Sequence, residues 1–368
     1  MQKIPFFNYP KIFQQRKQLY MDTLDDVLSR GAFIMQSDLE NFEKNLANKT
    51  GSSFALGVAD GTMALLMSLM ACGIKRGDEV IVPAHTFIAS AAAIHHVGAK
   101  PVLVDCGDDH LIDFNSAKNA ITNKTRAIMP VQLNGRVAKM DSILELADSE
   151  NLIIVEDSCQ SLGASYKNRQ AGTFGKAGTF SFFPAKTLGC FGDGGAIITN
   201  DEEIAEKLKI IRDHGRDSSD GKVKLYGFNG RLDNIHAAIL DKKLEFYDQD
   251  INRRREIATI YQENLNDLDV LKLPPAPDSD PDHYDVYQNY EIEAINRDSL
   301  REFLSDNGIG TILQWGGYTI NNFEDLGFNQ KLKETDLMRS RFLMLPMHPL
   351  LTDEEVLYIC ETIKEFYH

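Results

Sequence analysis

The chain alternates short apolar segments with helical stretches from about residue 53 to about residue 215, and this alternation constrains its fold more than any other feature. The clearest apolar segments cover residues 53–58, 79–82, 101–104, 127–131, 152–155, 178–182 and 196–199. Apolar runs of this length, separated by helices, are typical of a parallel sheet that is covered on both faces. We therefore predict an α/β fold whose main sheet is largely parallel and lies between helices.

The segments outside this alternation suggest two domains. A helix is expected from Ser37 to Gly51, because Ser37 and Glu40 have the spacing of a capping box and glycine often ends a helix. One or two long helices cover residues 232–265, and the stretch 273–282, rich in Pro and Asp, is the clearest break in composition. A strand at 284–292, a helix at 297–307 and a last helix with a capping box at 352–355 follow. We predict a large domain at residues 1–265 and a small C-terminal α/β domain at residues 266–368.

The composition argues against several classes of protein. The formal net charge of −15 disfavours a surface that neutralises nucleic-acid phosphates or anionic lipids. The five cysteines are scattered without CxxC spacing, so we expect neither a disulfide framework nor a zinc site. No stretch reaches the ~18 consecutive apolar residues of a membrane span, and no signal peptide is recognisable. We expect a cytoplasmic protein that binds neither nucleic acid nor membranes.

Polar residues that directly follow apolar strands mark the candidate site, because ligands of open α/β sheets bind at the carboxyl ends of the strands. Gly61 and Thr62 stand where the first strand ends and a helix begins, and the free amides of a helix N-terminus favour a phosphate. Many such turns only cap a helix, so this feature is weak by itself.

Two further strands end in residues with chemical potential. Glu156 and Asp157 end a buried strand, and Asp157 is either a cap or partner of a nearby arginine, or a counter-ion for a cationic ring nitrogen. Lys186 follows the strand at 178–182 in an apolar, glycine-rich surround. Desolvation there would lower its pKa and favour the nucleophilic neutral amine.

The histidines do not predict a metal site. His85, His95 and His96 lack the HExxH spacing and an acidic partner nearby in the sequence. We interpret them as packed or surface residues and expect no metal.

Taken in chain order, the turn at Gly61, the aromatic Phe87, Asp157 and Lys186 resemble the fold-type I enzymes that use pyridoxal 5′-phosphate. More closely, the chain resembles the DegT/DnrJ/EryC1/StrS family of nucleotide-sugar aminotransferases. The matching segments are GTMAL (61–65), GDEVIVP (77–83), TFIA (86–89), EDSCQ (156–160), SFFPAK (181–186), GFNGRL (227–232) and LPMHP (345–349). The resemblance implies a mainly parallel seven-stranded sheet between helices, a small C-terminal domain, and pyridoxal phosphate as the cofactor, with pyridoxamine phosphate as its aminated form.

The resemblance also implies a role for each matching residue. Lys186 would hold the cofactor aldehyde as a Schiff base and then move a proton between Cα and C4′. Asp157 would keep the pyridine nitrogen protonated. The other cofactor contacts would be Phe87 stacked on the ring, Gln160 beside the ring oxygen, Gly61, Thr62 and Ser181 at the phosphate, and Asn229 reaching the phosphate from a second subunit. A homodimer with shared active sites is therefore expected.

The implied reaction moves an amino group from an amino acid, expected to be L-glutamate, to a UDP- or dTDP-linked keto sugar. Such a reaction belongs to amino-sugar and surface polysaccharide biosynthesis, for example of lipopolysaccharide O-antigen. The loop after the lysine, with GDGG at 192–195, looks more like that of 3-aminotransferases, so a 3-keto sugar is favoured over a 4-keto sugar. The alternative from another class is a regulatory protein that binds the cofactor without turnover. The segment QWGGY (314–318) stands where many relatives have His-Tyr-Pro, and we assign no sugar contact to it.

Overall fold

The computed structural model describes residues 3–368, and its centre is a seven-stranded sheet. The strands are, in spatial order, β1 (Phe54–Val58), β9 (Gly195–Thr199), β8 (Ala177–Ser181), β5 (Ile153–Asp157), β4 (Thr125–Ile128), β2 (Glu79–Pro83) and β3 (Lys100–Val104). β9 runs antiparallel to both of its neighbours, and the other pairs are parallel. The predicted α/β fold with a mainly parallel sheet is confirmed.

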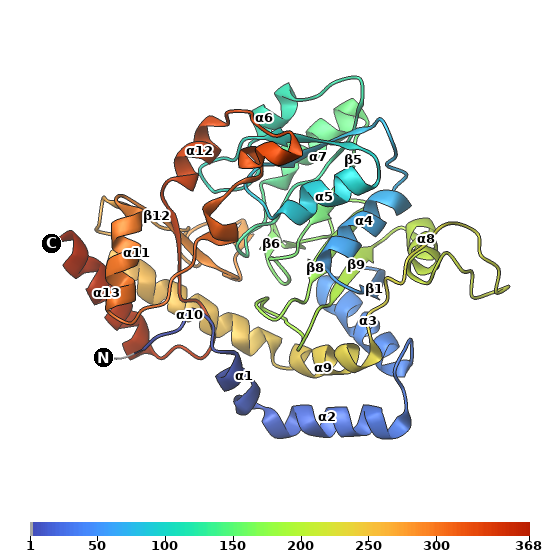
Figure 1. Cartoon of the computed structure of the whole chain (residues 1–368), viewed down its shortest axis with the longest axis horizontal. Helices are drawn as coiled ribbons and strands as arrows, with labels where there is room; N and C mark the ends of the chain where they lie inside the picture. The colour runs from blue at the N-terminus through green and yellow to red at the C-terminus, as the bar shows by residue number, and fades with distance from the viewer. Residues whose placement is uncertain (1–2) are drawn as a thin grey trace.

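Helices cover this sheet and connect its strands (Figure 1). In the large domain they are α1 (Tyr9–Gln15), α2 (Lys17–Arg30), α3 (Ser37–Thr50), α4 (Gly61–Ala71), α5 (Ile88–His96), α6 (Phe114–Asn119), α7 (Met140–Glu150), α8 (Glu202–Arg212) and α9 (Asn234–Leu244). α4 is the most central of these, because it contributes Leu65 and Leu69 to one hydrophobic cluster and Ala64 and Met67 to another. Its N-terminus is consequently held firmly at the end of β1.

The capping of α3 differs from the prediction. Ser37 is the first residue of the helix and makes no capping hydrogen bond, so the predicted box with Glu40 is wrong. Instead, Asn234 from α9 accepts the backbone N–H of Leu39 at 3.0 Å. Gly51 ends the helix in the left-handed conformation, with φ of 69°, as predicted.

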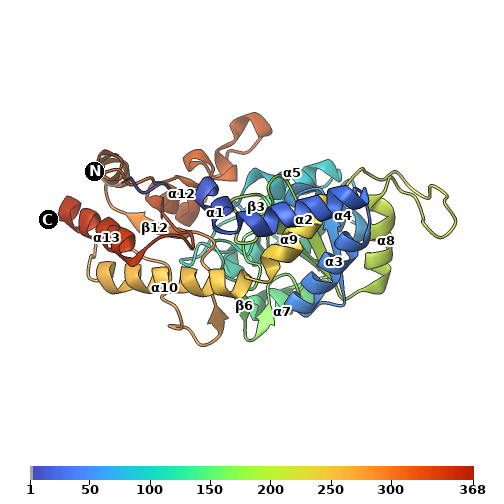
Figure 2. The same ribbon diagram turned by 90° about the horizontal axis from the view of Figure 1, so that it is seen from below.

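A second hydrophobic cluster forms the small lobe. The antiparallel strands β10 (Leu271–Lys272), β12 (Tyr290–Ala294) and β13 (Phe342–Leu345) pack with α11 (Arg297–Asp306), α13 (Asp353–Tyr367) and the second half of α10 (Tyr247–Leu265). α10 runs from the large domain into this lobe, as Figures 1 and 2 both show. The short helices η1 (Gln314–Gly317), η2 (Ile320–Asn322), η3 (Glu324–Leu326) and α12 (Lys333–Arg339) precede β13. The capping box of α13 is confirmed, whereas the domain boundary after residue 265 stays a prediction.

The strand expected at 284–292 is interrupted. β11 (His283–Tyr284) pairs with β6 (Ser165–Tyr166), which in turn pairs with β7 (Arg169–Gln170), while β12 begins only at Tyr290. Tyr287 between them is in the left-handed region with φ of 47°, which ends an extended strand. The side chains of Gln288 and Asn289 turn toward the large domain instead. This interruption brings Gln288 and Asn289 into contact with Ala185 and Asn134, next to the site described below.

No helix within residues 3–368 combines the length and the apolar character that crossing a membrane requires.

Candidate active site

Most of the predicted site residues lie around one cavity of about 480 Å³ at the carboxyl ends of the sheet strands. The structure brings seven of them together there, namely Gly61, Thr62, Phe87, Asp157, Gln160, Ser181 and Lys186. Asn229 does not line the cavity.

The N-terminus of α4 forms one wall of the cavity. Asp60 caps the helix, because its Oδ1 accepts the N–H of Met63 at 2.8 Å. A Cβ on Gly61 would lie 2.8 Å from the Cβ of Ser181, so a side chain at this position would displace Ser181. Glycine therefore keeps the first amides of α4 and the Ser181 hydroxyl close together, which is an arrangement that suits a phosphate.

The two acids at the end of β5 point to opposite sides. Glu156 is fully buried, and its carboxylate accepts the backbone N–H groups of Gly172, Phe174 and Gly175. Asp157 lines the cavity, and its Oδ2 accepts the hydroxyl of Ser90 at 2.7 Å. Asp157 has no arginine partner among the ion pairs of residues 3–368, so it is available as the counter-ion of a cationic ring nitrogen.

Lys186 lies on the turn after β8. Gln288 holds this turn on both sides, since its Oε1 accepts the N–H of Thr187 at 2.7 Å and its Nε2 donates to the carbonyl of Ala185 at 2.8 Å. Burial lowers the pKa of Lys186, although Cys159 and the nearby Asp157 oppose this effect. The lysine forms no ion pair within the described part of the chain. These conditions favour a nucleophilic amine.

Phe87 and Gln160 complete the polar and aromatic surround of the cavity. Phe87 is the N-cap residue directly before α5, and 51% of its surface is exposed, which suits a ring that stacks on a flat ligand. The Gln160 Oε1 accepts the backbone N–H of Asn134 at 2.9 Å and the Nδ2 of Asn289 at 3.2 Å. Its amide NH₂ is thereby left to donate to a ligand oxygen in the cavity. A phosphate seat, a counter-ion, a stacking ring and an amine together fit a phosphorylated pyridine aldehyde.

Several residues around this cavity were not predicted from the sequence. Ser90 lies one helical turn after Phe87, so its spacing was a usable signal. Gln288 and Trp315 come from the C-terminal part of the chain, after residue 265, and no local pattern indicates where they lie. His85, predicted to have no acidic partner, meets one in Glu291, with 3.0 Å between His85 Nε2 and Glu291 Oε1. Potential metal-ligand atoms of His85, Glu291 and His110 lie within 4.8 Å of one another, and both rings hydrogen-bond to Glu291.

Asn229 lies outside the cavity and is exposed. It belongs to the connection between α8 and α9, where its Oδ1 accepts the Nε of Arg231 at 3.0 Å. Part of this connection extends away from the body of the molecule beyond α8 in both views (Figures 1 and 2). Tyr226 in the same connection is 98% exposed.

Comparisons with known proteins agree with this geometry. The sequence profile of the DegT/DnrJ/EryC1/StrS aminotransferase family matches residues 14–364. A protein of Geobacillus stearothermophilus named pleiotropic regulatory protein is 37% identical over 99% of this chain and 98% of its own length. The dTDP-3-amino-3,4,6-trideoxy-α-D-glucose transaminase of Streptomyces venezuelae is 36% identical over 99% of this chain and 96% of its own length.

Solved structures give the same result. The crystal structure of S. venezuelae DesV in complex with a ketimine intermediate has a TM-score of 0.94 and 34% identity, and the match covers 100% of this chain and 99% of DesV. NtdA from Bacillus subtilis with the bound cofactor PMP has a TM-score of 0.92 and 29% identity, over 99% of this chain and 85% of NtdA. The fold-type I architecture and the pyridoxal phosphate cofactor are thereby confirmed. The chain belongs to the DegT/DnrJ/EryC1/StrS aminotransferase family and is an enzyme of the sugar aminotransferase type.

Proposed function

We propose that this enzyme transfers the amino group of L-glutamate to carbon 3 of a UDP- or dTDP-linked keto sugar, with Lys186 and Asp157 as its catalytic residues. The observation that carries the proposal is the position of Lys186, a half-buried lysine without a carboxylate partner in the described chain, in the same cavity as Asp157. Pyridoxal phosphate, when bound, supplies an electron sink for the carbon that loses its proton.

Each of the predicted cavity residues has a defined task in this reaction. The amine of Lys186 would hold the cofactor aldehyde and, once released by the amino donor, would carry the proton between the donor Cα and the cofactor C4′. Asp157 holds a proton on the pyridine nitrogen, and its hydrogen bond from Ser90 fixes the carboxylate in place. Gly61, Thr62 and Ser181 hold the phosphate, Phe87 stacks on the ring, and Gln160 donates to the ring oxygen.

We infer that the active enzyme is a homodimer in which Asn229 completes the phosphate site of the partner subunit. Asn229 is exposed and outside the cavity of its own subunit, in the connection between α8 and α9, where it pairs with Asp213. Among the described residues that line the cavity, Lys186 is the one cation, beside Asp60, Asp157 and Asp193. A substrate that carries a diphosphate needs more positive charge than this, and a second subunit is its natural source.

The choice of carbon 3 is supported by the GDGG segment after Lys186 and by the S. venezuelae relative, which is named for a 3-amino sugar. Amino-sugar biosynthesis for surface polysaccharides is the corresponding pathway. The G. stearothermophilus relative, named as a regulatory protein, keeps open a second function in which the cofactor is bound without turnover.

A two-stage absorbance experiment tests this function. The holoenzyme is titrated with L-glutamate and, as a control, D-glutamate, and the bleached enzyme is then given 3-keto and 4-keto sugars linked to UDP or dTDP. We expect L-glutamate to bleach the visible band and a 3-keto sugar to restore it, with the product position read by NMR. Recovery with 4-keto sugars alone would correct the position, and a band that no amino donor changes would favour the regulatory function.

A further inference from the structure

Trp315 is the one tryptophan of the chain, and it lines the cavity that contains Lys186. Every other lining residue belongs to the segment 60–193, so within the described chain Trp315 is the one lining residue that comes from the part after residue 265. The residues that fit the cofactor all come from the large domain. Trp315 therefore lies on a wall that the cofactor residues leave open to a substrate.

The backbone at Trp315 is in a conformation that needs support. Trp315 has φ of 49° and ψ of 33°, and the following Gly316 and Gly317 have φ of 75° and 86°. The left-handed region costs a residue with a Cβ roughly 1–2 kcal/mol. A bulky aromatic side chain is found there only where the surroundings over-determine it.

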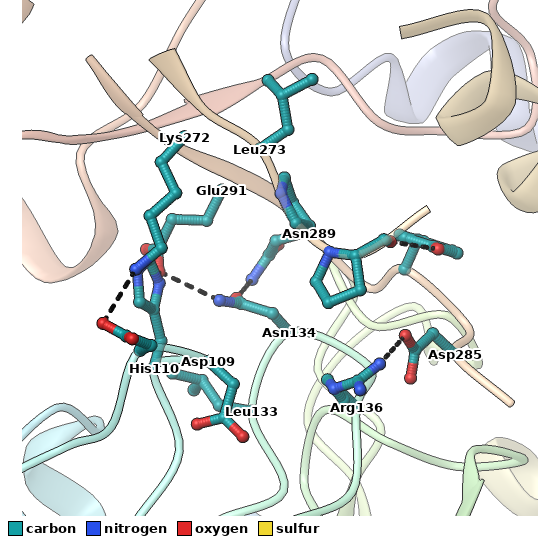
Figure 3. A pocket seen from close by; sticks show the side chains of 14 residues that line it. Asp109, His110, Leu133, Asn134, Arg136, Lys272, Leu273, Asp285, Asn289 and Glu291 are labelled. Atoms are coloured by element: carbon teal, nitrogen blue, oxygen red, sulfur yellow. Dashed lines mark hydrogen bonds and ion pairs between the residues drawn. The ribbon is translucent and has the colours of Figure 1, made fainter. Parts of the chain in front are cut away.

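Gln314 provides this support from the preceding position. Its side chain is buried, and its Nε2 donates to Glu291 Oε2 at 2.7 Å and to Asn134 Oδ1 at 2.6 Å. Asn134 also donates from its Nδ2 to Glu291 Oε1 at 3.0 Å and accepts from the Nδ2 of Asn289 at 2.9 Å. Figure 3 shows Asn134 between Glu291 and Asn289. Because Gln160 accepts from both asparagines, the network connects the Trp315 loop with the cofactor cavity.

The network is also charged. Glu291 Oε1 accepts from His85 Nε2 at 3.0 Å and from His110 Nδ1 at 2.9 Å, and both rings come from the large domain. Burial opposes ionisation of Glu291, but the two histidines hold its pKa well below its usual range. The ring of His85 lies edge-on to Trp315, with 5.1 Å between the centroids. The buried carboxylate of Glu291 thus binds Gln314, which precedes Trp315 in the loop. It also binds His85, whose ring packs against the indole.

We propose that the indole of Trp315 packs against the sugar ring of the nucleotide-linked substrate and selects for it, and that Glu291 and Gln314 are positioning residues for this contact. An aromatic face binds the apolar C–H face of a sugar ring, and the indole N–H provides one hydrogen-bond donor for a hydroxyl. A dicarboxylate such as glutamate gains nothing comparable from an uncharged indole. The inference rests on the proposed function, because it assigns the acceptor of the same reaction.

The two half-reactions of the holoenzyme separate this inference from the proposed function. For Trp315→Ala we expect kcat/KM for the keto sugar to fall by about tenfold or more, which corresponds to about 1.4 kcal/mol of lost binding. Bleaching by L-glutamate should stay within about twofold of the wild type. Tyr318→Ala is the matched control, because Tyr318 is exposed on the same loop but does not line the cavity.

The fluorescence of the single tryptophan gives a readout that does not depend on turnover. We expect the wild-type emission to be quenched when the cofactor is loaded, and to change again when the nucleotide-linked sugar binds. For Glu291→Gln and Gln314→Ala, the emission anisotropy should fall and KM for the sugar should rise, while the rate with L-glutamate is kept. If one of these two variants does not fold, the other still tests the positioning role.

The outcomes distinguish the possible failures. Equal sugar kinetics in Trp315→Ala, Tyr318→Ala and the wild type would overturn the role of Trp315. Equal losses in both half-reactions of Trp315→Ala would also overturn it, since they would indicate a general packing role. A wild-type enzyme that L-glutamate does not bleach would instead contradict the proposed function.

Discussion

Asp157 and Glu156 are adjacent on β5, so their side chains lie on opposite faces of the sheet. We expect Asp157→Ala to slow amino transfer from L-glutamate on the order of 10²–10³-fold, because the pyridine nitrogen loses its counter-ion. Glu156→Gln is the matched control. It should leave the rate per folded molecule nearly unchanged but lower the free energy of unfolding by about 2 kcal/mol or more, because buried N–H groups lose a charged acceptor. Stopped-flow absorbance and urea unfolding measure the two effects, and interchanged results would refute the assignment.

His110 gives a prediction about pH at the same scale. Burial by itself lowers the pKa of His110, but its hydrogen bonds to Glu291 and Glu293 raise it to about 9. A group whose folded pKa is raised stabilises the fold below its unfolded pKa, and this contribution is lost as the pH rises through the folded value.

The thermal unfolding of His110→Gln, compared with the wild type, tests this prediction. The difference in Tm should be largest near pH 6, shrink through the range up to about pH 9, and be small above it. The charged groups that face His110 are Glu291 and Glu293, whose pKa values are both lowered, so they keep their charge over this range; Lys272 pairs with Glu293. A Tm difference that grows with pH would contradict the protonated state of His110.

Among the secondary-structure elements, α3 shows where a local pattern misleads. Asn234 is fully buried, and besides accepting from Leu39 it donates to the carbonyl of Ala32 at 2.7 Å. We expect Asn234→Ala to lower the free energy of unfolding by about 1–3 kcal/mol, because the carbonyl of Ala32 and the N–H of Leu39 each lose a buried hydrogen bond. Ser37→Ala, which removes the expected cap, should have little effect in the same denaturant titration. A larger loss of stability in Ser37→Ala than in Asn234→Ala would show that Ser37 caps α3 after all.

The strands of the main sheet could be predicted to within a few residues because their signal is local: an apolar run, then a polar residue, then a helix. The same signal places the site residues from Gly61 to Lys186 at one edge of the sheet. The positive φ of Tyr287 and the partner of Leu39 depend on residues that are distant in the sequence, so no local pattern reveals them.

The part of the site that lies after residue 265 could not be predicted either, because its position also depends on residues that are distant in the sequence. Trp315 is placed by Gln314 and Glu291, and the contacts of Glu291 come from the other domain. One signal was available, since Glu291 and Glu293 alternate with apolar residues in a short strand, and a buried carboxylate requires partners. The sequence does not indicate which partners these are.

At the scale of the whole molecule, the shared active site predicts complementation between subunits. Lys186→Ala and Asn229→Ala homodimers should each transfer amino groups poorly, because every site lacks one of the two residues. A mixed dimer contains one site with both residues intact, so co-expression with two different tags should restore up to about half of the wild-type activity. Mixed dimers of Lys186→Ala with Asp157→Ala are the control. Both residues belong to the cavity of the same subunit, so each site of this mixed dimer lacks one of them, and we expect no recovery of activity.

If mixed dimers of Lys186→Ala and Asn229→Ala recover no more activity than this control, Asn229 acts within its own subunit. Purification of the enzyme as an active monomer would contradict the shared site more directly.

The central claim is that Lys186 binds the cofactor and that an amino donor releases it. Borohydride reduction of the holoenzyme followed by peptide mass spectrometry tests both parts, because reduction makes the lysine–cofactor bond permanent. We predict the label on Lys186 before L-glutamate is added and its loss when L-glutamate is added before the reduction. Label on a different lysine, or label on Lys186 that L-glutamate does not remove, would contradict the account.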